Sequence, residues 1–185
     1  MPLDIAAGIF ISFGLAGSPG LPLGLDFVVL CVLFTLLPDL DFIFYIFREG
    51  GVTGKWAHQH RDLLHKPLIY IPIGVLFFLP FGLQIIEAFV TGSVFHFLHD
   101  AVGMGWGIKL LWPFSKKNYK FFGGEQKLFT RTFVTSWTDA ELHTMVSARN
   151  DENWIKQFYL RPHPLGIFEY VMLVLSLGAL FFALQ

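Results

Sequence analysis

Carboxylate and imidazole side chains gather in three short stretches of this sequence. Asp39 and Asp41 lie in the stretch LPDLD, the segment HQHRDLLHKP at 58–67 contains three of the seven histidines, and His96 precedes Asp100 by four residues. Ionisable groups in apolar segments are costly, so they usually face a protein interior and mark a function. A mixture of imidazole and carboxylate suits zinc, iron or manganese better than magnesium or calcium. The sequence therefore predicts a metal site whose ligands are Asp39, Asp41, His60, His65, His96 and Asp100.

The spacing within these stretches sets conditions on the backbone. His96 and Asp100 share one face of a helix, because residues four apart lie about one turn from each other. Asp39 and Asp41 point roughly 200° apart on a regular helix with 3.6 residues per turn. They converge only if the helix is interrupted, which Pro38 favours because it lacks an amide donor, or if metal ions lie on both sides of the helix.

The elements that must position these residues are membrane helices. The chain has 185 residues and a mean hydropathy of +0.58, and 15% of its residues are charged, against about 25% in soluble domains. A spanning helix needs roughly 20 mostly apolar residues. The predicted fold class is all-α, a polytopic membrane helical bundle forming a single domain, 1–185. About five spans are expected, at 5–25, 27–47, 67–86, 88–108 and 165–184. Because successive spans alternate in direction, the six predicted ligands lie at similar depth near one membrane surface.

A polar insert at 113–163 separates the last two predicted spans. Its first part, PFSKKNYKFFGGEQK, interleaves basic and aromatic residues. This pattern is typical of a juxtamembrane loop that meets anionic lipid heads, and it is also compatible with a loop that holds an anionic substrate. Thr138 followed by Glu141 predicts a capping box, and the apolar stripes after it predict two short amphipathic helices at the membrane interface. No nucleic-acid partner is expected, because the net charge of −1 is not basic.

The distribution of basic residues predicts the orientation in the membrane. All thirteen lysines and arginines lie between Arg48 and Arg161, four of them in 48–66 and eight in 116–161. Cytoplasmic loops carry an excess of basic residues. Both polar segments are therefore expected to face the cytoplasm.

The order of the candidate ligands resembles that of a known family. The chain is similar over about residues 30–115 to the YdjM/YbcI-like membrane-bound metal-dependent hydrolases of bacteria and archaea. The similarity lies in the order of three motifs, LPDLD, then His60-Arg61 with His65, then His96-x-x-x-Asp100. The family is grouped with zinc-dependent phospholipase C and the S1/P1 nucleases. The resemblance implies a helical metal site in the cytoplasmic membrane that hydrolyses phosphoester bonds. The expected metal is zinc, with manganese or iron as alternatives, and one to three ions are expected.

The resemblance implies a role for Arg61, whereas the expected roles of Lys66, Asp62 and His99 follow from their chemistry and their position beside the predicted ligands. Arg61 is the phosphate-facing cation, and Lys66 adds a positive charge that would help bind the substrate. Asp62 or His99 is the expected general base, since neither is needed as a ligand. The implied substrate is a phosphorylated lipid or lipid-linked molecule whose head group reaches the metal while its tail stays in the bilayer.

Two other functions fit the same residues. The first is a non-catalytic membrane protein that binds or handles a metal ion. The second is a di-iron lipid hydroxylase, which also uses histidine clusters near the cytoplasmic membrane face, although Asp39 and Asp41 then have no role. Iron content and an oxygen-dependent product would distinguish the hydroxylase from a hydrolase.

Overall fold

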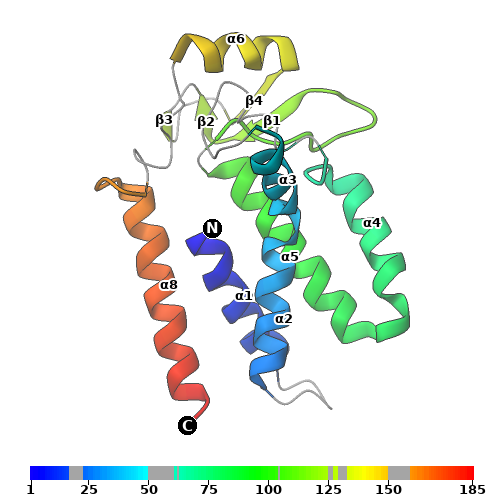
Figure 1. Ribbon diagram of the computed structural model, residues 1–185, viewed down its shortest axis with the longest axis vertical. Helices are drawn as coiled ribbons and strands as arrows, with labels where there is room; N and C mark the ends of the chain where they lie inside the picture. The colour runs from blue at the N-terminus through cyan, green and yellow to red at the C-terminus, as the bar shows by residue number, and fades with distance from the viewer. Residues whose placement is uncertain are drawn as a thin grey trace. The chain divides into compact units, whose positions relative to one another are not determined.

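Helices make up most of the described chain. The structure is a computed structural model that describes residues 1–16, 23–49, 61, 63–103, 105–124, 127–128, 133–149 and 159–185 (Figure 1). The helices are α1 (Pro2–Leu15), α2 (Leu25–Leu36), the 3₁₀ turn η1 (Leu37–Asp39), α3 (Leu40–Glu49), α4 (Pro67–Phe78), the 3₁₀ turn η3 (Leu79–Phe81), α5 (Leu83–Val102), α6 (Asp139–Arg149) and α8 (Pro164–Ala183). The strands are β1 (Asn118–Phe121), β2 (Gly123–Gly124), β3 (Lys127–Leu128) and β4 (Val134–Trp137).

Among the described residues, three helical stretches are long and apolar enough to cross a membrane. They are Leu25–Phe47, which runs through α2, η1 and α3, then Leu83–Val102 and Pro164–Ala183. The other two predicted spans correspond to shorter apolar helices, Pro2–Leu15 and Pro67–Phe81. At 1.5 Å per residue, α1 extends only about 21 Å, short of the roughly 30 Å of hydrocarbon in a bilayer. A membrane protein with three candidate spans is therefore what the structure supports, and the number five stays a prediction.

Chain contacts divide the protein into two compact units. Unit 1 comprises 1–37, 73–96 and 155–185, and unit 2 comprises 38–72 and 97–154. Unit 1 holds α1, α2 and α8, whereas unit 2 holds α3, the strands and α6. Helices α4 and α5 each supply residues to both units.

In unit 1, α1 packs against both α2 and α8 (Figure 1). The approach to α2 depends on a small residue, because a Cβ atom at Gly8 would lie 2.5 Å from the Cα atom of Val32. The Thr35 hydroxyl of α2 donates a hydrogen bond to the Asp4 carbonyl of α1 at 2.9 Å. Small residues and buried hydroxyls are typical of close packing between membrane helices, where lipid tails remove the hydrophobic drive for association.

Unit 2 contains two small antiparallel sheets, which corrects the prediction of an all-α fold. β1 pairs with β4, with Asn118 opposite Trp137 and Phe121 opposite Val134, and β2 pairs with β3. The strand sequences NYKF and VTSW are rich in aromatic and β-branched residues, as strands usually are. Runs of four residues are too short for an alternating pattern to stand out against the surrounding basic loop, which is why the sequence did not predict them.

The predicted capping box at the start of α6 is confirmed. The backbone N–H and the hydroxyl of Thr138 donate to the Glu141 carboxylate at 2.7 and 2.8 Å, and the Glu141 N–H donates to the Thr138 hydroxyl at 3.3 Å. The backbone hydrogen bond from Thr138, and to a smaller extent the hydroxyl hydrogen bond, hold the pKa of Glu141 below its usual value. The second predicted amphipathic helix falls mostly on 150–158, outside the described residues, and the interfacial location of both helices stays a prediction.

The first turn of α6 is anchored to the sheet by one carboxylate. The buried Lys109 ammonium donates to Asp139 at 3.0 Å, and the Asn118 amide of β1 donates to the other oxygen of Asp139 at 3.1 Å. A buried ammonium requires such a partner, because an unpaired one would lose its hydration without compensation. Asp139 thus ties α6, β1 and the chain after α5 together within unit 2.

Apolar side chains of unit 2 pack around the end of α5. Phe97, Ala101 and Ile108 are buried together, and the Tyr70 ring of α4 meets the Phe97 ring edge-on with centroids 5.5 Å apart. The same Phe97 ring lies edge-on to the imidazole of His65, with centroids 6.1 Å apart. This cluster therefore forms the apolar wall of the polar site described below.

Candidate metal centre

The backbone between α2 and α3 brings two carboxylates to one imidazole. Residues Leu37–Asp39 form the 3₁₀ turn η1, and α3 begins at Leu40. This change of helix type breaks the regular spacing that would point Asp39 and Asp41 apart. As a result, Asp39 Oδ1 lies 3.7 Å from His65 Nε2, and Asp41 Oδ2 lies 2.9 Å from His65 Nδ1. Both aspartates therefore approach the same imidazole, one at each ring nitrogen, and their role as metal ligands stays a prediction.

His65 lies among three carboxylates and is completely buried. Besides Asp39 and Asp41, Asp100 Oδ2 is 3.1 Å from its Nε2 atom. The backbone N–H of Leu64 donates to Asp41 Oδ2 at 3.3 Å, which helps fix that carboxylate beside Nδ1. A carboxylate on one ring nitrogen orients the imidazole and leaves the other nitrogen for a metal ion, as in many metal sites. Here Nε2 faces Asp39 and Asp100.

The carboxylates also determine the protonation of His65 when no cation is bound. Burial alone lowers the pKa of His65, but the hydrogen bonds and charges of Asp100 and Asp41 outweigh burial and raise that pKa to about 9. The proton therefore offsets part of the negative charge of the cluster. A metal ion that binds Nε2 has to displace this proton, so metal binding at this site would release protons.

Arg61 approaches the same cluster from the segment before α4. Its Nη2 atom donates to Asp100 Oδ1 at 2.8 Å. The guanidinium also lies against Gly105, since a Cβ atom at that position would sit 2.8 Å from Arg61 Nη1. Gly105 has a φ of +119°, a conformation that side chains disfavour. The glycine therefore permits both the turn after α5 and the approach of Arg61 to Asp100.

Lys120 is a cation beside this site that sequence reasoning did not single out. It lies on β1, and its Nζ atom donates to the Gly105 carbonyl at 2.6 Å. Burial, and then the charge of Arg61, lower the pKa of Lys120 to about 8. The available signal was the strand alternation in NYKF, which buries Asn118 and Lys120 on one face. That signal was obscured because the whole segment resembles a basic surface loop.

His96 belongs to unit 1 and pairs there with a carboxylate that was also missed. Its Nδ1 atom lies 3.3 Å from Asp4 Oδ1, and both side chains are buried. On α5, His96 lies one turn before Asp100, so the two share a helix face, as the spacing predicted. Asp4 could have been noticed as the lone carboxylate of the apolar segment PLDIAAG.

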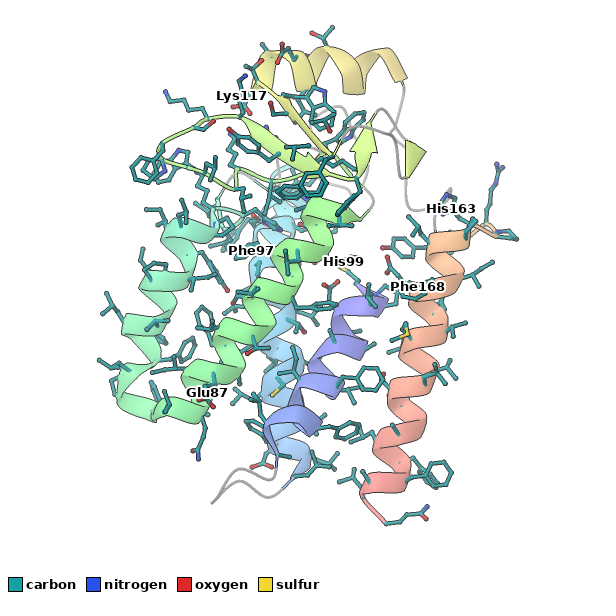
Figure 2. The ribbon with its side chains drawn as sticks, turned by 180° about the vertical axis from the view of Figure 1, so that it is seen from behind. Glu87, Phe97, His99, Lys117, His163 and Phe168 are labelled. Atoms are coloured by element: carbon teal, nitrogen blue, oxygen red, sulfur yellow. The ribbon has the colours of Figure 1, made fainter. Side chains whose placement is uncertain are left out.

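The remaining predicted residues are less closely tied to the cluster. His60 and Asp62, like His58, lie outside the described residues. The Lys66 ammonium lies 4.8 Å from the centre of the Trp112 ring, a cation–π contact. Figure 2 shows His99 and Phe97 on opposite sides of α5, and Phe97 is the residue that packs on His65. The proposed roles of Lys66 in substrate binding and of His99 as general base stay predictions.

The donor set of unit 2 fits a divalent metal ion. Asp41 Oδ1 is buried and has no hydrogen-bond partner among the described residues. A buried carboxylate oxygen without a donor is costly, and a cation would compensate it. Together, Asp39, Asp41, Asp100 and His65 offer carboxylate oxygens and one imidazole nitrogen, the ligand mixture used by zinc, manganese and iron.

The chain matches the model of a known protein family. The family model described as YdjM inner membrane protein matches residues 4–185. Neither the curated proteins nor the solved structures include a match to the chain.

Proposed function

Because the chain belongs to the YdjM inner membrane protein family, we propose that it is a membrane-bound, metal-dependent hydrolase that cleaves a phosphoester of a lipid or lipid-linked substrate. The observation that carries this proposal is the environment of His65, a fully buried imidazole within 3.7 Å of three carboxylates. The ligand order resembles the YdjM/YbcI-like hydrolases, and the grouping of that family with zinc-dependent phospholipase C and the S1/P1 nucleases is the reason for proposing phosphoester chemistry.

The proposed metal is zinc, with manganese or iron as alternatives and one to three ions. The residues that would hold it are Asp39, Asp41, His65 and Asp100, joined by His60 and by His96, whose Nδ1 atom faces Asp4. When bound, a divalent ion lowers the pKa of a coordinated water to about 7 and neutralises charge on phosphoryl oxygens.

The protein's own groups would bind the substrate and move the proton. Arg61, already directed at Asp100, would hold the phosphoryl group, and Lys66 would add a second positive charge. Asp62 or His99 would accept the proton of the attacking water. The apolar helices would keep the lipid tail in the bilayer while the head group reaches this polar cluster.

Elemental analysis followed by a substrate screen tests the proposal. The detergent-purified protein should contain at least one equivalent of metal, and it should release phosphate or a phosphorylated head group from one member of a lipid panel. His65→Ala should lose both properties, whereas His143→Ala, a histidine of α6 outside the cluster, should keep both. Folded wild-type protein that binds no metal would refute the proposal.

A non-catalytic metal-binding or ion-handling protein is the second candidate. The complete burial of His65, together with that of Asp41, favours it, because structural metal sites are closed whereas catalytic sites keep an open position. Stoichiometric metal with no turnover across the panel, combined with metal uptake into vesicles that contain the protein, would favour this function over hydrolysis.

A further inference from the structure

A buried lysine, Lys120, and a partly buried arginine, Arg61, meet at one glycine in unit 2. Lys120 donates to the Gly105 carbonyl at 2.6 Å, and Arg61 lies where a side chain at Gly105 would otherwise be. The side chain of Arg61 is 18% exposed, and Lys120 is 9% exposed. Like charges repel strongly in such a place, because water screens them poorly.

The described contacts leave donors of both cations available. The Arg61 Nε atom is buried and has no hydrogen-bond partner among the described residues. Lys120 has three ammonium protons, and its hydrogen bond to the Gly105 carbonyl uses one of them. By contrast, Lys109, which is also buried in this unit, is neutralised by Asp139 at 3.0 Å. The Arg61–Lys120 pair therefore differs from Lys109, since Asp100, the carboxylate that pairs with Arg61 among the described residues, also pairs with His65.

The charge of the cluster favours an anion once a metal ion is bound. Asp39, Asp41 and Asp100 supply three negative charges, and Arg61 and Lys120 supply two positive charges. A divalent ion bound with neutral His65 leaves the group with one net positive charge. An anion that accepts several hydrogen bonds would balance this charge and satisfy the remaining donors, and phosphate does both.

We propose that Lys120 and Arg61 form an anion-binding subsite beside the metal centre, and that it takes the phosphoryl group of the substrate. The inference rests on the proposed function, and it adds β1 to the site. Phosphate esters of lipids and free inorganic phosphate share the required chemistry. The pairing of β1 with β4 holds Lys120 in place, because the Thr135 hydroxyl opposite it donates to its carbonyl at 3.4 Å.

Phosphate binding to purified, metal-loaded protein in detergent tests this subsite. Inorganic phosphate is titrated by calorimetry against a sulfate-free buffer of constant ionic strength, and mixed micelles containing phosphatidate or phosphatidylcholine form a second arm. Lys120→Gln keeps a donor for the Gly105 carbonyl but removes the charge, and Lys120→Arg keeps the charge. Lys117→Met is the matched control, because Lys117 is an exposed lysine just before β1 (Figure 2).

The Kd for phosphate should be at least tenfold higher in Lys120→Gln than in the wild type. In Lys120→Arg and Lys117→Met it should stay within threefold of the wild-type value. Tighter binding of phosphatidate than of inorganic phosphate would identify a lipid head group as the ligand, and the reverse order would identify a free phosphate. Metal content and circular dichroism verify that each variant is folded, and Lys120→Met is a second neutral variant if Lys120→Gln is not.

Two outcomes would overturn the subsite. One is phosphate binding by Lys120→Gln within twofold of wild type, which would leave Lys120 as a support for the Gly105 turn alone. The other is equal loss of binding in Lys117→Met, which would indicate diffuse surface charge. A protein that binds phosphate through Lys120 but hydrolyses nothing would instead refute the hydrolase and keep the subsite, so the two failures are distinguishable.

Discussion

Replacing Gly105 with alanine should damage the site more than the backbone strain alone explains. Gly105 has a φ of +119°, and a residue held in a sparsely populated backbone region costs about 1–3 kcal/mol. The new Cβ atom would also lie 2.8 Å from Arg61 Nη1. Arg61 can move away only by giving up its 2.8 Å hydrogen bond to Asp100, and hydrogen bonds to charged groups contribute about 1.5–3 kcal/mol.

A second glycine provides the control for backbone strain. Gly82 has a φ of +99°, and a Cβ atom there would meet nothing within 4 Å. Gly82→Ala should therefore show the strain alone, and Gly105→Ala should be less stable than Gly82→Ala by about 1.5–3 kcal/mol. The free energy of unfolding can be measured by titrating SDS into mixed micelles while following tryptophan fluorescence. Equal losses of stability in the two variants would show that Arg61 is not held against Gly105.

Three further predictions follow from the described contacts. Asp41→Asn should weaken metal binding by at least about 10–100-fold, because it removes the charge of a proposed ligand and because an amide orients His65 less well than a carboxylate, and competition with a chelator would measure the change. Folding lowers the pKa of Glu141, so its carboxylate stabilises the folded protein fully above the ordinary glutamate pKa. This stabilisation is lost as the pH falls through the lowered pKa of the folded protein. Glu141→Gln should abolish this acid-dependent loss of the α6 cap. The pKa of Lys120 is about 8 in the folded protein and 10.5 for an ordinary lysine, as in the unfolded chain. Between these pH values, in phosphate-free buffer, the unfolded chain holds a proton that the folded protein has released, so stability should rise with pH. Lys120→Gln should remove that rise, whereas an unchanged pH profile would contradict the burial of a lysine beside Arg61.

The sequence predicted the membrane helices because their signal is local. Apolar runs around 25–47, 83–102 and 164–183 contain enough residues to be recognised without tertiary information. The spacing of His96 and Asp100 and the proline before Asp39 likewise carry their geometric meaning within a few residues. The proline made an interrupted helix one of two possible arrangements for Asp39 and Asp41, but their meeting at His65 could not be read from these few residues.

The site residues that could not be predicted from the sequence depend on contacts between distant segments. Asp4 gains meaning only through His96, which lies 92 positions away in the chain. Lys120 resembles any basic residue of a juxtamembrane loop until β1 pairs with β4 and turns it toward Gly105. The charge and spacing of residues along the chain do not indicate which distant residues come together, because strand pairing and helix packing determine these contacts.

The 3₁₀ turn at Leu37–Asp39 makes this stretch sensitive to length more than to residue type. Removing or adding one codon between Asp39 and Asp41 would rotate one carboxylate by about 100° relative to the other. In a saturation library selected for the function of the protein, apolar substitutions at the exposed Leu40 should therefore be tolerated. Single-residue deletions and insertions beside Leu40 should be lost from the same library. Natural variation in this segment should be confined to substitutions that preserve its length.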